Sequence, residues 1–346
     1  MNKRVLLIIL IVFLVLGLGT FELIRDKMAE GTQTETSGLP NPVEKLETNP
    51  LQITQMRTKE YSGSDIVIEQ TLTPSSNYDR YISSYKSDGL KIYALLTVPN
   101  EEKPENGWPV VVFNHGYIPP DQYSTTERYT AYTDAFSRNG YIVFRPDYRG
   151  HGSSEGNPEG AYYSTAYTVD VLNAVSSIKK YKDTDPNRIG MWGHSMGGSI
   201  TLRSMVVTDD VKAGVIWAGV VASYEDMAEN WRRSRPWIPS QREQSTRRPN
   251  RQDLIDKFGD FDANPDFWRS ISPIYYVQDI SGPVQIHHGT SDPEVPVLFS
   301  ERLEEALKTA GKSVEFYKYQ GDDHNISTNL GLALQRSVEF FDKYVK

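Results

Sequence analysis

The stretch GMWGHSMGG, residues 190–198, places one serine among four glycines at the end of an apolar run. Glycine is costly inside regular secondary structure, so this cluster predicts a sharp turn with room only for small neighbours. The apolar run 189–192 predicts a buried strand, and residues 197–207 predict a helix. A G-x-S-x-G pattern between a strand and a helix is typical of a serine held as a nucleophile, which makes Ser195 the candidate.

Composition limits the class of protein. The chain has 346 residues, of which 38% are hydrophobic and 11% aromatic, so it can build a large core in one or two domains. Its net charge of −8 argues against a nucleic-acid partner, since such proteins are usually basic. The chain has no cysteine, which excludes disulfides, thiolate metal sites and a cysteine nucleophile.

The N-terminus predicts a membrane anchor. Lys3 and Arg4 precede the apolar run 5–21, and no clear cleavage site follows it. We expect residues 1–25 to form an uncleaved signal anchor, with the bulk of the chain outside the cytoplasm. A cleaved signal peptide and a secreted protein are the alternative. Residues 26–55 are rich in Thr, Pro, Gly and Glu and predict a flexible spacer before a domain at 56–346.

Strands and helices alternate through most of that domain. A turn signal at 87–89 between the strand patterns 81–85 and 91–98 predicts an antiparallel hairpin. Continuous apolar runs are typical of strands buried on both faces of a parallel sheet. They occupy 110–113, 141–144, 189–192, 214–218 and 283–287. Helical patterns separate the runs, so we predict an α/β fold with a doubly wound, mostly parallel sheet and an antiparallel N-terminal hairpin.

One stretch, residues 223–272, interrupts the alternation and predicts an inserted cap over the carboxyl edge of the sheet, where open α/β sheets bind ligands. A solvated helical excursion is the alternative. Arginines that face a pocket would favour an anionic substrate group, whereas arginines on the surface would only be solvated. The insert carries Arg232, Arg233, Arg235, Arg242, Arg247, Arg248 and Arg251.

A serine hydroxyl is a weak nucleophile and needs a base. Among six histidines, His324 follows the strand pattern 314–319 and precedes the final helix, so its loop can reach over the sheet. The acid that orients such a base is expected to be Asp292, in the loop after the strand that ends near 287. Glu294 is the rival acid. The order Ser195, Asp292, His324 is the order that this type of fold uses.

Acyl transfer also needs donors for the oxyanion. The backbone N–H of Met196, the residue after the nucleophile, is one candidate. The backbone N–H of Tyr117, after the first buried strand, is the second, with the Tyr117 hydroxyl as an alternative. No metal site, phosphate loop or dinucleotide fingerprint is evident, and this chemistry needs no cofactor.

From about residue 92 to its end, the chain resembles the α/β-hydrolases, in the branch of the prolyl oligopeptidase catalytic domain and the dienelactone-hydrolase-like esterases. The matching stretches are FNHGY, DYRGHGSSEG, GMWGHSMGG, SPIYY, IHHGTSDPEVP and GDDH. The resemblance implies the triad Ser195, Asp292 and His324, and a structural role for Asp147, Arg149 and His151. Roughly 60 residues separate the spacer from the sheet, too few for the β-propeller of prolyl oligopeptidases.

These observations predict a serine hydrolase that cleaves esters or short peptides through an acyl-enzyme. The sequence does not separate an esterase from a peptidase. The alternative is a catalytically inactive binding module on the same scaffold, since a fold does not fix a function. Such modules generally lack a triad member, whereas all three candidates are present here in order.

Overall fold

The computed structural model describes residues 48–232 and 238–346. The expected N-terminal anchor and most of the expected spacer lie outside these ranges. Within them, every helix is too short or too polar to cross a bilayer. Thr48 to Lys346 form one compact unit.

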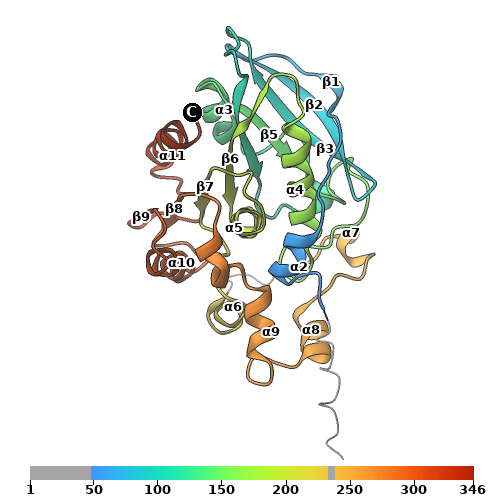
Figure 1. Cartoon of the computed structure of the whole chain (residues 1–346), viewed down its shortest axis with the longest axis vertical. Helices are drawn as coiled ribbons and strands as arrows, with labels where there is room; N and C mark the ends of the chain where they lie inside the picture. The colour runs from blue at the N-terminus through green and yellow to red at the C-terminus, as the bar shows by residue number, and fades with distance from the viewer. Residues whose placement is uncertain (1–47, 233–237) are drawn as a thin grey trace, which may run out of the picture. The chain divides into compact units, whose positions relative to one another are not determined.

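The described chain is built on a nine-stranded sheet of order β1-β2-β3-β5-β4-β6-β7-β8-β9 (Figure 1). The first four strands in this order pair antiparallel, and all strands from β5 to β9 pair in parallel. The strands are β1 (Val67–Thr71), β2 (Tyr78–Ser87), β3 (Leu90–Pro99), β4 (Trp108–Asn114), β5 (Ile142–Pro146), β6 (Thr184–His194), β7 (Ala213–Trp217), β8 (Val284–Gly289) and β9 (Val314–Tyr319). The prediction of a mostly parallel sheet with an antiparallel hairpin is confirmed.

Helices cover both faces of the sheet. One apolar cluster joins alternate strand residues such as Val110 and Val112 to helices α4 (Ala166–Ile178), α5 (Met196–Val207) and α10 (Val297–Thr309). The intervening Val111 and Phe113 pack on the other face, against α3 (Thr130–Arg138) and α11 (Leu330–Tyr344). This alternation follows the two-residue period of a strand. It explains why these strands are apolar throughout.

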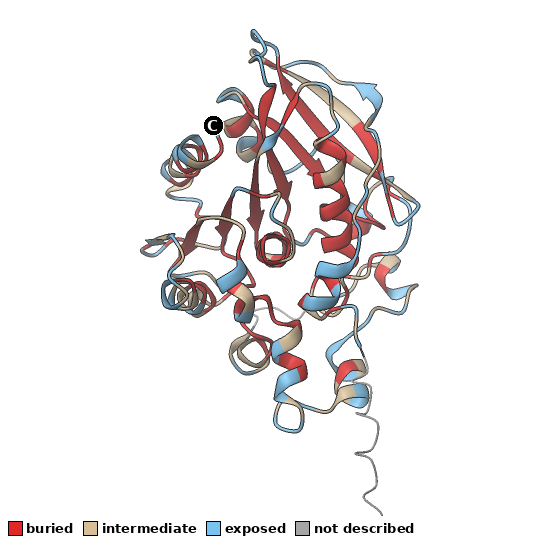
Figure 2. Cartoon of the chain, in the orientation of Figure 1, coloured by how far each residue is buried: buried red, intermediate tan, exposed pale blue. Residues whose placement is uncertain are grey.

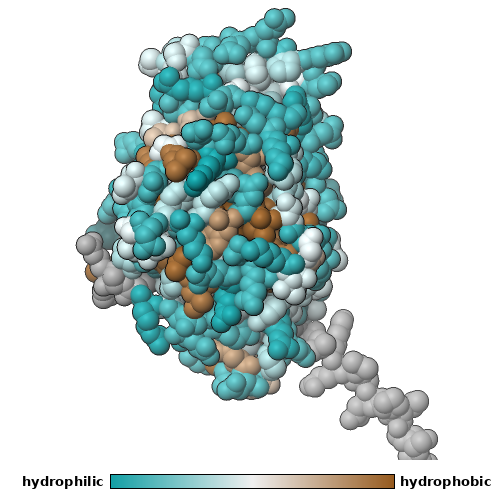
Figure 3. All heavy atoms as spheres, turned by 90° about the vertical axis from the view of Figure 1, so that its left-hand side faces the viewer, coloured by the Kyte–Doolittle hydropathy of each residue, from teal (hydrophilic) through white to brown (hydrophobic). Residues whose placement is uncertain are grey.

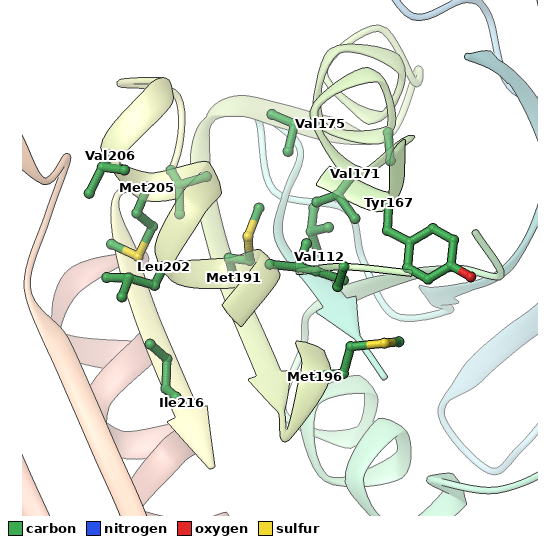
Figure 4. Close-up of a cluster of buried hydrophobic side chains, with 14 of the residues drawn as sticks. Val112, Tyr167, Val171, Val175, Met191, Met196, Leu202, Met205, Val206 and Ile216 are labelled. Carbon is green, nitrogen blue, oxygen red and sulfur yellow. The ribbon is translucent and has the colours of Figure 1, made fainter. Parts of the chain in front are cut away.

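Helices α4 and α5 pack against the central strands as part of the buried core. Figure 2 shows β4, β6 and β7 and the inner sides of these two helices as buried. In Figure 4, side chains from both helices converge on the strands, with Val171 and Leu202 near Met191 of β6. Because β6 runs straight into α5 at Ser195, this core fixes the position of the turn.

The predicted insert forms a helical group between β7 and β8. Its helices are α6 (Tyr224–Asn230), α7 (Gln241–Gln244), α8 (Arg251–Phe258) and α9 (Pro265–Ile271), and the 3-10 helix η2 (Pro273–Asp279) leads into β8. Helices α6, α8 and α9 lie together at the lower end of Figure 1. A separate apolar cluster that includes Leu254 and Trp268 holds the group together.

The start of the described chain packs against the insert and α5. Leu51 and Ile53, in the stretch expected to be spacer, are buried. Ile53 begins the short helix α2 (Ile53–Thr58). The buried guanidinium of Arg203 on α5 donates to the carbonyls of Leu51, at 3.1 Å, and Ile271, at 3.0 Å. The folded domain therefore includes residues from about Leu51 onward.

The sheet ends at β9, whose outer edge has no neighbouring strand in the described chain. Figure 3 shows this side of the molecule, with apolar side chains gathered in its middle among hydrophilic ones. Lys318 of β9 bonds Glu301 of α10 at 2.7 Å. Charged side chains on an edge strand discourage pairing with a second chain.

Candidate active site

Ser195 lies at the junction of β6 and α5 in an unusual backbone conformation, with φ 54° and ψ −116°. Its N–H donates to the carbonyl of Trp217 at 2.9 Å. Its own carbonyl accepts from the N–H groups of Gly198 and Val220, at 3.0 and 3.2 Å. A non-glycine residue at such angles is costly and persists only where its surroundings hold it, as they do here.

The glycines around Ser195 are explained by close backbone approach. A Cβ on Gly197 would lie 1.9 Å from the carbonyl oxygen of Asn114, at the end of β4. A Cβ on Gly193 would lie 2.3 Å from the carbonyl oxygen of Gly197. Both distances are far below van der Waals contact. The turn can therefore approach β4 this closely only with glycine at these positions.

The loops after β8 and β9 bring Asp292 and His324 together. His324 Nδ1 lies 2.7 Å from Asp292 Oδ2. The side chain of Asp292 is 1% exposed and that of His324 is 14% exposed. Because a carboxylate only accepts, His324 carries its proton on Nδ1 and leaves Nε2 available as an acceptor. Glu294, the rival acid, forms no hydrogen bond or ion pair with His324; its N–H instead donates to Asp292 Oδ1 at 2.8 Å.

Asp292 has a further partner that the sequence did not indicate. His288 Nε2 lies 3.1 Å from Asp292 Oδ2, and the N–H of Val295 donates to Oδ1 at 3.0 Å. Burial alone would raise the pKa of Asp292, but the hydrogen bonds from His288 and His324 outweigh it and hold the pKa well below its usual range. Asp292 is thus a fixed carboxylate.

A chain of hydrogen bonds links the turn to the neighbouring loops. The Gly116 N–H donates to the hydroxyl of Tyr129 at 3.0 Å, and this hydroxyl lies 2.7 Å from His194 Nδ1. His194 Nε2 lies 3.0 Å from the carbonyl oxygen of His324. Burial lowers the pKa of His194 to about 3, so its ring is neutral. A neutral ring fits one assignment, in which Tyr129 donates to Nδ1 and Nε2–H donates to His324.

The two expected oxyanion donors come from different parts of the chain, one directly after Ser195 and the other from the loop after β4. Met196 is the buried first residue of α5. Tyr117, from the loop after β4, lines the same cavity as Ser195. The Tyr117 hydroxyl donates to Glu243 Oε2 of α7 at 2.8 Å. This bond connects the loop to the insert. It also uses the proton of the Tyr117 hydroxyl, which was the alternative donor to the oxyanion.

A cavity of about 460 Å³ opens beside Ser195 and His324. Its wall is mainly aromatic and aliphatic. Arg128 and Glu294 are the charged residues of this wall, besides the titratable His324. The remaining lining residues are Gly116, Tyr117, Ile118, Tyr129, Tyr132, Tyr162, His194, Trp231, Val295 and Asn325. Among the described arginines of the insert, none lines this cavity. Arg248 pairs with Glu243, and Arg247 pairs with Asp253 at 2.8 Å.

The DYRGHG loop after β5 supports the site from behind. Arg149 forms a buried ion pair with Asp170 of α4 at 2.8 Å. Asp147 accepts from the hydroxyls of Tyr123, at 2.9 Å, and Thr125, at 2.5 Å. These contacts connect the sheet to the loop that carries Tyr117 and Tyr129, as expected of scaffold residues.

Within the described ranges, no group of three or more His, Asp or Glu side chains is arranged to hold a metal ion. His287 and His288, adjacent on β8, have separate partners. His287 Nδ1 contacts the Tyr319 hydroxyl at 2.8 Å, whereas His288 Nδ1 contacts the Ser300 hydroxyl at 2.7 Å. They point to opposite faces of the sheet, as neighbouring strand residues do.

Comparison with known proteins shows the family of the chain. A model of the prolyl oligopeptidase family matches residues 127–346. The uncharacterized peptidase YtmA of Bacillus subtilis (strain 168) is 25% identical over 259 residues, which cover 73% of this chain and 88% of YtmA.

Solved structures share the fold. A puromycin-hydrolyzing peptidase of Mycobacterium tuberculosis superposes with a TM-score of 0.61 at 23% identity, over 79% of this chain and 40% of that one. An acetyl xylan esterase from Paenibacillus sp. R4 gives a TM-score of 0.61 at 15% identity, over 84% of this chain and 92% of that one. The chain therefore spans less than half of the peptidase and nearly all of the esterase, and it has the α/β-hydrolase fold.

Proposed function

The chain belongs to the prolyl oligopeptidase family and is a serine hydrolase of the peptidase and esterase type, and on this premise we propose that Ser195, Asp292 and His324 are its catalytic triad. The observation that supports the proposal most directly is the 2.7 Å contact between His324 Nδ1 and the buried Asp292. His324 shares its cavity with Ser195, which the backbone holds at the tip of a strained turn.

The proposed reaction has two halves. Ser195 Oγ attacks the carbonyl carbon of an ester or amide while His324 Nε2 takes the hydroxyl proton. His324 then gives this proton to the leaving alcohol or amine as the carbonyl–leaving group bond breaks, which leaves an acyl-enzyme. A water, deprotonated by the same imidazole, attacks the acyl carbon. The bond to Ser195 Oγ then breaks, the acid leaves, and the imidazolium returns its proton to Oγ. Asp292 holds the ring in position and stabilises its transient positive charge.

Negative charge develops on the carbonyl oxygen in both halves. We assign the backbone N–H groups of Met196 and Tyr117 as its donors. Met196 is the first residue of α5, so the positive end of the helix dipole also favours the oxyanion. Removing one such donor typically costs about 10²–10³ in kcat.

The test is turnover by the full-length chain on p-nitrophenyl esters of increasing length and on aminoacyl and dipeptidyl p-nitroanilides. Ser195→Ala is expected to abolish activity on every active substrate, and a fluorophosphonate is expected to label the native chain but not this variant. Turnover that survives in Ser195→Ala, or absence of labelling in the native chain, would contradict the proposal.

The substrate panel also separates two classes of hydrolase. YtmA and the Mycobacterium tuberculosis protein are described as peptidases, and the Paenibacillus protein as an esterase. Hydrolysis of esters alone would assign the chain to the esterases, and anilide turnover at a comparable kcat/KM to the peptidases. The alternative of an inactive binding module is not favoured, because family relatives are hydrolases and each triad position is occupied.

We also propose that residues 1–25 anchor the enzyme in a membrane and that the stretch from 26 to the start of the folded domain near Leu51 connects this anchor to the hydrolase domain. The apolar run 5–21 in the sequence supports this. The anchor predicts that the native protein stays with membranes after alkaline carbonate washing. Release of the intact chain into the wash would reject the anchor, and a shortened chain in the medium would favour the cleaved signal peptide.

A further inference from the structure

Arg128 is a positive charge in the wall of the cavity that also contains the proposed nucleophile. Besides His324, only Arg128 and Glu294 bring a charge to the wall of the cavity among the described residues, and the rest of the wall is aromatic, aliphatic or neutral. The whole chain carries a net charge of −8, so this cation is not part of a generally basic surface.

The backbone presents Arg128 in a defined way. Arg128 and Tyr129 are both left-handed, with φ 53° and 50°, just before α3. The buried guanidinium of Arg145 on β5 holds this segment by donating to the carbonyls of Arg128, at 2.8 Å, and Glu127, at 3.1 Å. It also donates to the carbonyl of Thr125. Two consecutive left-handed residues that are not glycine are costly, and they persist because a buried side chain fixes them.

The Arg128 side chain has no structural task among the described residues. It is exposed, and it forms neither an ion pair nor a side-chain hydrogen bond with any of them. Arg145, in contrast, donates from Nη1 and Nη2 to backbone carbonyls and thereby supports the loop. An arginine fork matches a carboxylate with two parallel N–H···O bonds, which gives both affinity and orientation.

We propose that Arg128 binds a carboxylate group of the substrate, so that the enzyme prefers esters or amides that carry a free carboxylate on the acyl side or on the leaving side. This inference rests on the proposed function, because it places the carboxylate in the cavity where Ser195 attacks. Glu294 shares the cavity wall but forms no ion pair with Arg128.

The first experiment measures kcat/KM on matched pairs of esters. On the acyl side the pair is p-nitrophenyl butyrate and mono-p-nitrophenyl glutarate. On the leaving side it is phenyl acetate and 4-acetoxybenzoate. The variants are Arg128→Gln and, as a control with the same loss of charge, Arg269→Gln, an exposed residue of α9 that does not line the cavity.

Arg128→Gln is expected to lower kcat/KM for the carboxylate member of one pair by roughly 10- to 100-fold, as for a lost charge-assisted hydrogen bond. The kcat/KM for the neutral ester of the same pair is expected to change less than about twofold, because this ester makes no such bond. The affected pair identifies the side that carries the carboxylate. The proposal would be overturned if Arg128→Gln lowered kcat/KM equally for both members of each pair or did not lower it at all. It would also be overturned if Arg269→Gln lowered kcat/KM by the same factor.

A second measurement does not depend on turnover. In the Ser195→Ala background, calorimetry measures the affinity for glutarate monobutylamide and 4-acetamidobenzoate, which carry the carboxylate on the two sides. Adding Arg128→Gln is expected to weaken one of them at least tenfold, and equal affinities would reject the assignment. If no ester is hydrolysed at all, the catalytic proposal fails while this measurement still decides the role of Arg128.

Discussion

At the scale of single residues, the hydroxyl of Tyr129 has an unusual position. It accepts from Gly116 in the loop after β4 and donates to His194, which in turn bonds the backbone of His324. One oxygen atom thus connects the loop of the proposed oxyanion donor to the loop of the proposed base. Its role is to position these groups, because both of its hydrogen bonds go to protein groups, the Gly116 N–H and His194 Nδ1.

We predict that Tyr129→Phe lowers kcat about tenfold with a smaller change in KM. The substitution leaves the Gly116 N–H and His194 Nδ1 without a partner, and a buried unsatisfied group costs about 1–3 kcal/mol. Ester kinetics and the thermal midpoint measure the effect. A loss of stability without loss of kcat would show that the hydroxyl only supports the fold. Tyr317→Phe, which removes a hydroxyl on β9 far from the cavity, is the control.

Much of the site follows from local sequence patterns. Ser195 is marked by its glycines, and the loops of Asp292 and His324 follow recognisable buried strands. No local sequence pattern indicates the left-handed conformation of Arg128 and Tyr129. This conformation depends on Arg145, which is 17 positions away from Arg128 in the sequence. The bond from His288 to Asp292 is equally hidden, since a histidine that ends a strand looks the same whether or not it faces a carboxylate.

At the scale of elements, the short helix α7 attaches the insert to the loop after β4. Its buried Glu243 carboxylate accepts hydrogen bonds from the Tyr117 hydroxyl and the N–H of Ser240, and it forms an ion pair with Arg248. Ser240 and Glu243 also form a reciprocal capping box that starts the helix. The hairpin and the alternating strands could be predicted from sequence, but this contact could not, because it joins residues 126 positions apart.

We predict that Glu243→Gln detaches α7 and lowers kcat/KM several-fold. Breaking a fully buried pair costs about 3–5 kcal/mol, and the cost here is lower because Arg248 is 22% exposed. Limited proteolysis is expected to cut near residues 238–250 in this variant before the rest of the domain. Arg247→Gln, which removes only an exposed ion pair, is expected to behave as the native chain. Unchanged kinetics and proteolysis in Glu243→Gln would mean that α7 does not depend on this carboxylate.

At the scale of the whole molecule, buried histidines couple folding to pH. Burial lowers the pKa of His194 to about 3 and that of His151 to about 4, and it lowers the pKa of His115 and His287 well below the usual value. In the unfolded chain these rings titrate near pH 6.5, so below that pH the unfolded state binds more protons. Each ring therefore stabilises the fold above pH 6.5 and loses this contribution as the pH falls.

Asp147 acts in the opposite direction. Burial raises its pKa to about 6 against the hydrogen bonds from Thr125 and Tyr123. Its stabilising contribution is therefore complete below about pH 4 and is lost as the pH rises through 6. Asp170, whose pKa burial also raises, acts in the same direction as Asp147. Because these two carboxyls oppose four buried histidine rings, we predict that the urea midpoint falls between pH 7 and pH 5.

His151→Phe tests this account of the pH dependence. His151 packs edge-on against Tyr123, Tyr148 and Tyr167, and a phenyl ring fits such packing without titrating. The variant is expected to show a smaller fall in urea midpoint between pH 7 and pH 5. A native-like fall would mean that His151 does not contribute to the pH dependence.

The hydrogen-bond chain through Tyr129 also bears on how such an enzyme can change. It joins segments that are 65 and 130 residues apart in the sequence. A chimaera that receives the segment between β4 and α3 from a relative without a tyrosine at position 129 leaves His194 without its hydrogen-bond donor. Recombination breakpoints between Gly116 and His324 are therefore tolerated only where both parents share these partners, and the loops around Ser195 exchange as one block.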